Sequence, residues 1–244
     1  MNSVIKKALY YFALLTTITI GAGVCMEVSV METSKERGKG GIVFIRHGEG
    51  EHNVEHIYNS NPENPGYKAV KLTDHGREQV RETSDQLLDG GINGDNVCKV
   101  IVSPLPRTIE TADIVMGKLQ IARFLREIDP RVIEQNAGER DGQDYLQYKD
   151  PDFWFPEHPK RYGGETRLEI RDRMESLILS IVNDRNCDLS KQYVIVVSHG
   201  SPLLLAQQFM GMGDERLKTA GYRIIPYSQV QKVMGNDVLH RDAS

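Results

Sequence analysis

Three short apolar segments of the chain are each followed by side chains that suit the binding and transfer of a phosphoryl group. The three groups, in chain order, are Arg46 with His47, Ser103 with Arg107, and Ser198 with His199. Phosphoryl transfer needs positively charged donors on the nonbridging oxygens, a nucleophile in line with the leaving oxygen, and an acid that protonates that oxygen. Two arginines, two histidines and the carboxylate of Glu134 supply this set, so the sequence indicates phosphoryl-transfer chemistry.

The pair Arg46-His47 contains the predicted nucleophile. Arg46 is a fixed cation that binds anions and disfavours protonation of the imidazole next to it, which leaves a neutral ring nitrogen free to attack phosphorus. Because the pair ends a strand and precedes Gly48, we expect the side chain of His47 to be exposed there. One arginine and one histidine at a strand end are common, so the inference depends on the convergence of all three groups.

The segments that precede these groups are predicted strands of one sheet. Residues 41–45, 100–103 and 193–198 are runs of β-branched and other apolar residues bounded by turn signals, which is typical of buried parallel strands. Parallel strands end at the same edge of a sheet, where open α/β proteins bind their ligands. The predicted helices run from Thr73 as N-cap to Gly90, from 107 to 119, from 165 to 182, and from Ser201 as N-cap to 210.

Further segments are predicted to surround the same edge. A short strand at 132–134 delivers a carboxylate, and the run 222–234 forms an edge strand because Pro226 cannot donate a ladder hydrogen bond. The polar connection 53–71 is predicted to be a loop beside the site. Residues 135–164 are rich in aromatic side chains without a clear period, so they form either a cap over the site or a surface-packed excursion with no ligand role.

The composition fits one folded domain and limits its partners. The chain has 244 residues, 39% hydrophobic and 26% charged, which is enough to bury one large core. A net charge of −4 excludes a broad basic field for nucleic acid, so an anion site must be a local cluster of arginine and histidine. Three cysteines show neither the spacing of a zinc site nor the density of a disulfide scaffold. We therefore expect no nucleic-acid partner and no structural metal.

The N-terminal segment has the pattern of a secretory signal peptide. Two lysines precede the uncharged stretch 8–24, which ends near small residues and gives way to a polar segment. An uncleaved membrane anchor formed by 8–24 and an ordinary buried helix are the alternatives. We therefore predict a signal peptide or anchor at 1–25, a linker at 26–40 and a catalytic domain at 41–244. The protein is expected to be exported, with a cytoplasmic location as the alternative.

Export would allow Cys98 and Cys187 to be oxidised. Both precede predicted strands that carry site residues, so we expect them at the edge of the sheet away from the pocket. Their spacing does not say whether they meet.

The motifs around the three groups resemble those of the histidine phosphatase superfamily, in its phosphoglycerate-mutase-like branch. The similar motifs are Arg46-His47-Gly48-Glu49 with Asn53, Ser103-x-x-x-Arg107-Thr108-x-x-Thr111-Ala112, and Ser198-His199-Gly200. The resemblance covers Gly41 to about Val233, and three motifs in this order and spacing are highly specific.

This resemblance implies a three-layer α/β/α sandwich with a mostly parallel central sheet, and a covalent phosphohistidine on His47 without a metal or other cofactor. Arg46, Arg107 and His199 would clamp the phosphoryl group, His199 would also take part in catalysis, and Asn53 would lie at the rim. The implied activity is metal-independent hydrolysis of a small phosphomonoester. The sequence predicts neither the identity of this substrate nor the oligomeric state of the protein.

Glu134 is the predicted general acid and base. The stretch from Ile133 to Gly138 resembles the place where this branch carries its acid, although Ala137 stands where an aromatic residue is usual. Glu139 and Asp141 are the next candidates. A surface carboxylate at a strand end is the alternative for Glu134, and reach to a leaving group decides between the two.

Three other functions stay open as alternatives. Phosphoglycerate-mutase-type transfer is the first, although the segment after Glu134 lacks the basic, tryptophan-containing run associated with mutase members of the family. A metal-dependent hydrolase would use His52 and His56, whose spacing of four suits zinc, but an arginine clamp would repel a cation. A noncatalytic phosphate-binding protein is the third, against which the presence of both histidines, both arginines and an acid argues.

Overall fold

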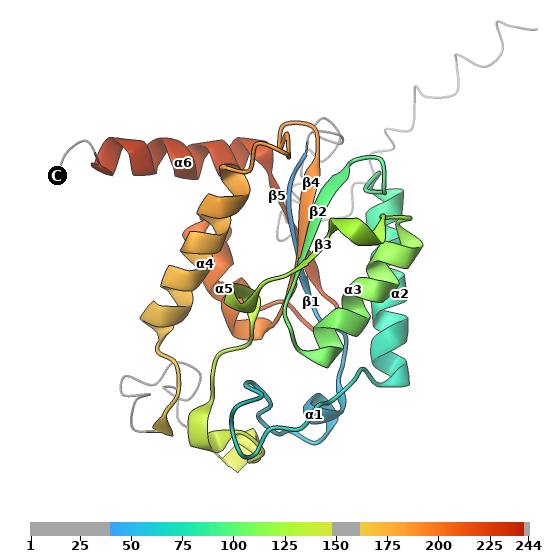
Figure 1. The fold of residues 1–244 in the computed structure, drawn as a ribbon, viewed down its shortest axis with the longest axis vertical. Helices are drawn as coiled ribbons and strands as arrows, with labels where there is room; N and C mark the ends of the chain where they lie inside the picture. The colour runs from blue at the N-terminus through green and yellow to red at the C-terminus, as the bar shows by residue number, and fades with distance from the viewer. Residues whose placement is uncertain (1–39, 148–161, 242–244) are drawn as a thin grey trace, which may run out of the picture. The chain divides into compact units, whose positions relative to one another are not determined.

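A computed structural model describes residues 40–147 and 162–241 of the chain. Within them, five strands form one sheet of order β3-β2-β4-β1-β5 (Figure 1). The strands are β1 (Gly41–Arg46), β2 (Val97–Val102), β3 (Arg126–Ile128), β4 (Tyr193–Ser198) and β5 (Tyr222–Pro226). β4 pairs in parallel with β1 and β2, β2 also pairs in parallel with β3, and β5 runs antiparallel to β1. The expected α/β fold with a mostly parallel sheet is confirmed.

Helices cover both faces of this sheet and form the outer layers of a three-layer sandwich (Figure 1). One face carries α2 (Asp74–Asp89) and α3 (Pro106–Lys118), and the other carries α4 (Arg167–Val182) and α5 (Gly200–Phe209). The remaining helices are α1 (Glu51–Val54), which follows β1, and α6 (Tyr227–Arg241). Short 3-10 turns span Arg123–Leu125, Pro130–Val132, Gly138–Arg140 and Tyr145–Gln147.

Strand β1 is buried on both faces, as its unbroken apolar sequence requires. Ile42 and Phe44 belong to the core shared with α4 and α5, whereas Val43 and Ile45 belong to the core shared with α2 and α3. All four side chains have no exposed surface. Because successive strand residues point to opposite faces, β1 is fixed between two cores, and this fixes where His47 leaves the sheet.

The four predicted helices are present, with small shifts at their starts. The hydroxyl oxygen of Thr73 accepts a hydrogen bond from the backbone N–H of Gly76 at 2.9 Å, which confirms the predicted N-cap of α2. Pro106 is the first residue of α3. Helix α5 begins at Gly200 with His199 as its N-cap, so the prediction of Ser201 as the cap is wrong.

Two strand predictions are wrong in whole or in part. Residues 132–134 are not a strand, because Pro130 starts a 3-10 turn that the side chain of Asp129 caps, and the outer strand is the earlier β3. The C-terminal run is an edge strand only as far as Pro226, and residues 227–241 are helix α6. Proline has no N–H to continue the ladder, so pairing ends there.

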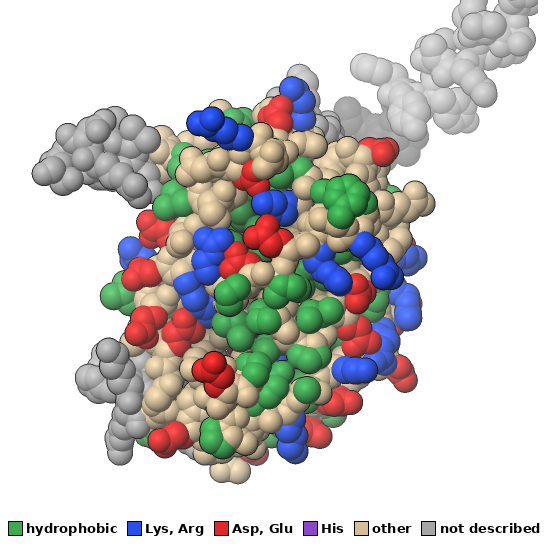
Figure 2. Space-filling model, viewed as in Figure 1, with side chains coloured by type: hydrophobic (Ala, Val, Ile, Leu, Met, Phe, Trp, Pro, Cys, Tyr) green, Lys and Arg blue, Asp and Glu red, His purple; other side chains and the backbone are tan. Residues whose placement is uncertain are grey.

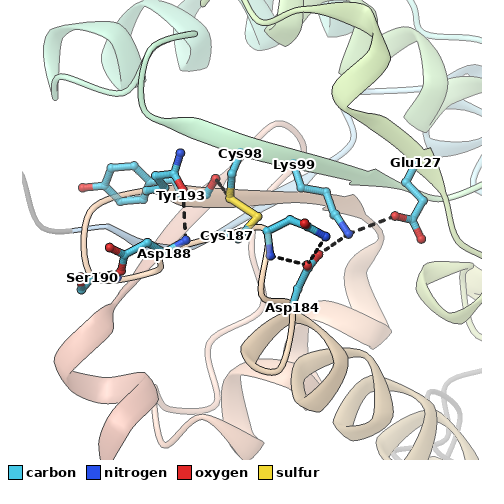
Figure 3. Close-up of a disulfide and its surroundings, with 10 residues drawn as sticks. Cys98, Lys99, Glu127, Asp184, Cys187, Asp188, Ser190 and Tyr193 are labelled. Atoms are coloured by element: carbon cyan, nitrogen blue, oxygen red, sulfur yellow. Dashed lines mark hydrogen bonds and ion pairs between the residues drawn. A yellow bond between two sulfur atoms is a disulfide. The ribbon is translucent and has the colours of Figure 1, made fainter.

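Cys98 and Cys187 form a disulfide that joins β2 to the loop before β4 (Figure 3). Their Cα atoms lie 5.6 Å apart. Beside them, Lys99 forms ion pairs with Asp184 at 2.5 Å and with Glu127 at 3.3 Å. Both cysteines lie toward the amino ends of β2 and β4, away from the edge that carries the predicted site residues, as expected.

The described helices and one face of the molecule bear on membrane spans and on surface charge. Within residues 40–147 and 162–241, every helix is too short or too polar to cross a membrane, and the stretch 8–24 lies outside these residues. Figure 2 shows one face of the molecule, on which acidic and basic side chains are interspersed around a group of apolar ones. That face lacks the broad basic field that attracts nucleic acid.

Candidate active site

A cavity of about 270 Å³ lies where the chain leaves the carboxyl ends of β1, β2 and β4. Five of the six predicted site residues line it, namely Arg46, His47, Asn53, Arg107 and Glu134. The sixth, His199, lies next to His47, with 5.1 Å between the ring centroids. The structure thus brings together all the residues that three distant motifs and one loop contribute.

His47 follows β1 and is held in one orientation. Its Nδ1 lies 2.7 Å from the carbonyl oxygen of Gly48, and its Nε2 lies 3.4 Å from Nε of Arg107. Gly48 is tightly confined, because a Cβ there would lie 2.5 Å from the backbone oxygen of Gly76 in α2. The side chain of His47 is 1% exposed, so the expectation of an exposed histidine is wrong. The loops and helix starts around the strand end cover it.

Burial keeps the imidazole of His47 neutral. Loss of solvent lowers the pKa of His47 well below its ordinary value, and the positive charge of Arg107 lowers it further. Arg46 acts in the same direction, with a smaller effect than Arg107. The expected role of Arg46 on its neighbour is therefore present, but Arg107 contributes more.

Arg107 is fully buried at the start of α3. Its two terminal nitrogens donate to Asn59, Nη1 to the side-chain oxygen at 3.0 Å and Nη2 to the backbone oxygen at 2.7 Å. Burial lowers the pKa of Arg107 to about 10, and the charge of Glu134 opposes this shift. The guanidinium is therefore still protonated at neutral pH and lies in a site with little water.

Arg46 and Asn53 both line the cavity. Nη1 of Arg46 donates to the backbone oxygen of Leu217 at 2.8 Å, while its Nε is buried without a hydrogen-bond partner in the described structure. The side-chain oxygen of Asn53 accepts the backbone N–H of Gly50 at 3.0 Å. Burial lowers the pKa of Arg46. Both residues are thus fixed by the backbone around them.

His199 stands at the amino end of α5 and is completely buried. Its Nε2 lies 2.7 Å from Oγ of Ser103, the polar residue that follows β2. Its Nδ1 is buried and has no hydrogen-bond partner among the described residues. Burial and the charge of Arg107 lower the pKa of His199 well below its ordinary value, so this ring too is neutral at neutral pH.

Glu134 is the predicted acid that faces the cavity. Its carboxylate accepts the backbone N–H groups of Gly200 and Ser201, each at 3.3 Å, at the positive end of α5. Asp141 is used elsewhere, because it accepts hydrogen bonds from the N–H and hydroxyl of Ser60, both at 2.9 Å. Glu139 is exposed on a 3-10 turn and does not line the cavity.

The loop after α1 and the start of the predicted cap pair with each other to form one wall. Backbone hydrogen bonds join Tyr58 to Gln143 at 3.0 Å and Tyr145 to His56 at 2.8 Å. Tyr58, Tyr145 and Tyr162 line the cavity, so the predicted loop and the described ends of the cap do lie beside the site. Other predicted cap aromatics, at 148 and 153–155, lie outside the described residues.

Several cavity residues lie outside the sequence motifs. Arg216 lines the cavity and donates from Nη2 to Oγ of Ser201 at 3.1 Å, and burial lowers its pKa. It comes from the loop before β5, where the sequence offers no pattern that marks it. Arg140 also lines the cavity and stacks 3.9 Å over the ring of Tyr162. His52 also lines the cavity. Its position between His47 and Asn53 of the first motif is the sequence feature that could have marked it as a site residue.

The two histidines of the metal alternative do not share a helix face. His52 is buried in α1, whereas His56 follows that helix with a φ of 57° and lies against the hydroxyl of Tyr145 at 3.1 Å. In the part of the chain that the structure describes, no three side chains of His, Cys, Asp or Glu form a group able to hold a metal ion.

This arrangement defines a class of site. Neutral buried imidazoles beside the buried guanidinium of Arg107 and the half-buried one of Arg46, at the carboxyl edge of a mostly parallel sheet, are suited to bind an anion and to attack it. The sequence profile of the histidine phosphatase superfamily (branch 1) matches residues 42–231. The chain belongs to this superfamily, as its motifs predict.

Proteins similar to this chain include mutases and phosphatases. A 2,3-bisphosphoglycerate-dependent phosphoglycerate mutase of Glaesserella parasuis is 26% identical and is matched over 72% of this chain and 87% of its own length. The mitochondrial serine/threonine-protein phosphatase Pgam5 of Drosophila ananassae is 26% identical over 70% of this chain and 50% of its own. The structure of a mycobacterial glucosyl-3-phosphoglycerate phosphatase has a TM-score of 0.55 at 17% identity, over 75% of this chain and 88% of that one. That structural likeness shows the shared fold.

Proposed function

We propose that this protein is a phosphomonoester hydrolase that works through a covalent phosphohistidine on Nε2 of His47. The observation that carries the proposal is the 2.7 Å contact between Nδ1 of His47 and the carbonyl oxygen of Gly48. A carbonyl oxygen only accepts hydrogen bonds, so the ring proton belongs on Nδ1 and the lone pair on Nε2. Nε2 is then a neutral nucleophile beside the guanidinium of Arg107.

The proposed reaction has two steps. In the first, Nε2 of His47 attacks phosphorus, the bond from phosphorus to the ester oxygen breaks, and Glu134 gives its proton to the departing oxygen. In the second, Glu134 takes a proton from water, the water oxygen attacks phosphorus, the N–P bond breaks, and inorganic phosphate leaves. Water is the one co-reactant, and Glu134 returns to its starting state.

Arg46, Arg107 and His199 are proposed to hold the nonbridging oxygens, with Asn53 at the rim. The arrangement supports this role because fixed positive charge in a site with little water stabilises charge on the phosphoryl group more than it would in bulk water. The unpartnered Nδ1 of His199 and Nε of Arg46 are two buried polar atoms that a bound phosphoryl oxygen would pair with.

Water is proposed as the phosphoryl acceptor in preference to a second phosphoglycerate, and no metal is proposed to take part. Relatives of both activities exist, so the deciding assay supplies 3-phosphoglycerate with and without 2,3-bisphosphoglycerate. Free phosphate should appear without the bisphosphate, and faster than 2-phosphoglycerate. Primer-dependent isomerisation that outpaces phosphate release would establish the mutase instead. A chelator should leave the rate unchanged, whereas loss of activity restored by zinc would favour the metal-dependent alternative.

The covalent intermediate is tested directly with a radiolabelled phosphomonoester. A brief reaction should leave an acid-labile, base-stable label on the peptide that contains His47, and His47→Ala should show neither label nor turnover. Full activity in His47→Ala would end the covalent mechanism.

We also propose that the protein is exported and that residues 1–25 are a signal peptide or an anchor. The disulfide between Cys98 and Cys187 supports this, because structural disulfides persist in oxidising compartments. Intact-mass measurement on protein from the native host should show a mature N-terminus between Val24 and Val30. An unprocessed chain in a cytosolic fraction would contradict export.

A further inference from the structure

His52 is a third buried histidine of the cavity, and the proposed reaction leaves it without a role. It lies in α1, is 7% exposed, and lines the same cavity as His47. The centroids of the two rings are 5.5 Å apart, and their planes are inclined by 47°. At this separation, one phosphoryl group bound beside His47 is within reach of both rings.

The backbone before α1 is shaped around this ring. A Cβ at Gly50 would lie 2.8 Å from Nδ1 and 3.0 Å from Cε1 of His52, so any other residue at position 50 would displace the imidazole. The turn is closed by the hydrogen bond from Gly50 to the side chain of Asn53. The sequence Gly-x-His-Asn therefore holds the ring at the cavity wall.

Packing alone does not explain a histidine here. Within residues 40–147 and 162–241, Nδ1 of His52 is buried without a hydrogen-bond partner, which is destabilising. An apolar side chain would fill the same space without that cost. Burial and the charges of Arg107 and Arg46 lower the pKa of His52 well below its ordinary value, so the ring is neutral at neutral pH. A neutral imidazole offers one N–H donor and one acceptor to a ligand.

We propose that His52 is a substrate-contacting residue whose Nε2–H, on the ring edge away from Gly50, donates a hydrogen bond to a nonbridging oxygen of the phosphoryl group bound beside His47. This inference rests on the proposed function, since it places the phosphoryl group on the His47 side of the cavity. Arg46, His52 and Arg107 all line the cavity that contains His47. The contact is to the phosphoryl group, so it serves every substrate regardless of the leaving alcohol.

Two substitutions separate a hydrogen bond from a packing role. His52→Phe keeps a planar ring without a donor, whereas His52→Gln keeps an N–H donor near the place of Nε2. The dissociation constant of orthovanadate is measured by calorimetry on the full chain. We expect about 10- to 100-fold weaker binding in His52→Phe, the loss typical of one hydrogen bond to a charged group, and recovery of most of it in His52→Gln. His75→Gln, on the exposed side of α2, is the matched control and should bind as wild type.

A measurement on the unaltered enzyme guards against a variant that fails to fold. With nitrogen-15-labelled histidine, orthovanadate should shift the ring-nitrogen resonances of His52, which are assigned by their absence in His52→Gln. Wild-type affinity in both His52 variants, equal losses in both with an intact fold, or unmoved resonances would overturn the inference. A dependence of vanadate binding on His52 without any phosphohistidine on His47 would contradict the proposed function alone.

Discussion

Asn59 accepts hydrogen bonds from both terminal nitrogens of Arg107, at 3.0 Å from Nη1 to its side-chain oxygen and at 2.7 Å from Nη2 to its backbone oxygen. The third nitrogen, Nε, lies 3.4 Å from Nε2 of His47. A loop residue therefore sets the orientation of a buried guanidinium on α3, and through it the surroundings of the proposed nucleophile. The same two hydrogen bonds satisfy donors that burial would otherwise leave unpaired.

Asn59→Leu should loosen the orientation of Arg107 while the backbone hydrogen bond to Nη2 persists, and it also removes the 2.7 Å hydrogen bond from Nδ2 of Asn59 to the backbone oxygen of Lys68. Loss of one hydrogen bond to a buried charged group is worth about 1.5–3 kcal/mol, so we expect kcat/KM to fall about 10- to 100-fold. Steady-state kinetics on an aryl phosphate provide the measurement. Asn183→Leu removes an exposed amide at the end of α4 and serves as the control. Unchanged kinetics in Asn59→Leu would show that Arg107 is held by other contacts.

The three buried histidines make stability depend on pH. Burial is the main cause that lowers the pKa values of His47, His52 and His199 well below the ordinary range. In the unfolded chain each histidine takes up a proton near pH 6.5, whereas in the folded chain each stays neutral. The unfolded state therefore binds more protons below that pH, and stability falls as pH is lowered from about 6.5 towards the lowered folded pKa values.

Each of these histidines should contribute a slope that approaches about 1.4 kcal/mol per pH unit well below pH 6.5, as long as the folded ring stays neutral. Urea denaturation between pH 7 and 5 measures the slope. His52→Gln should lose the share of one histidine. If His52→Gln and wild type have the same slope, the pKa of His52 is not lowered by folding.

The disulfide should support stability and leave catalysis unchanged. Cys98 and Cys187 are separated by 89 residues, and closing a loop of that length stabilises a fold by about 4–5 kcal/mol in the chain-entropy description. The double variant Cys98→Ser and Cys187→Ser should therefore unfold at lower urea concentration. Its kcat should match the wild type, because the bond lies at the opposite end of the strands from the cavity. A lower kcat in the double variant would show that the disulfide end of the sheet affects the catalytic end, and it would contradict this prediction.

The sequence predicts those site residues that strands and helices place at one edge of the sheet. Apolar runs fix three strands, and parallel strands end at one edge, so Arg46, His47 and His199 had to meet there. Arg107 follows the same logic, since Pro106 starts the helix directly after β2. These positions depend on local periodicity and on one topological rule, both of which a single sequence displays.

The residues that form the wall of the cavity cannot be predicted from periodicity and strand topology. Tyr58, Asn59 and Arg216 come from connections without a period, and their places follow from contacts between distant segments, such as Tyr58 with Gln143. The burial of His47 was missed for the same reason, because the segments that cover it are loops and helix starts. Likewise, the change from β5 to α6 at Pro226 was hidden, because apolar residues continue on both sides of it.

Glu134→Gln should reveal whether Glu134 protonates the leaving oxygen. We expect kcat to fall roughly 100- to 10,000-fold on an alkyl phosphate, whose oxygen needs a proton in the transition state, and far less on an activated aryl phosphate. Gly200 and Ser201 donate to different oxygens of the Glu134 carboxylate, so glutamine keeps one of these two hydrogen bonds at the start of α5. Glu139→Gln, a change at an exposed carboxylate outside the cavity, should behave as wild type on both substrates. Equal losses on both substrates in Glu134→Gln would instead indicate that Glu134 only holds the start of α5 by hydrogen bonds, because such a structural role affects every substrate alike.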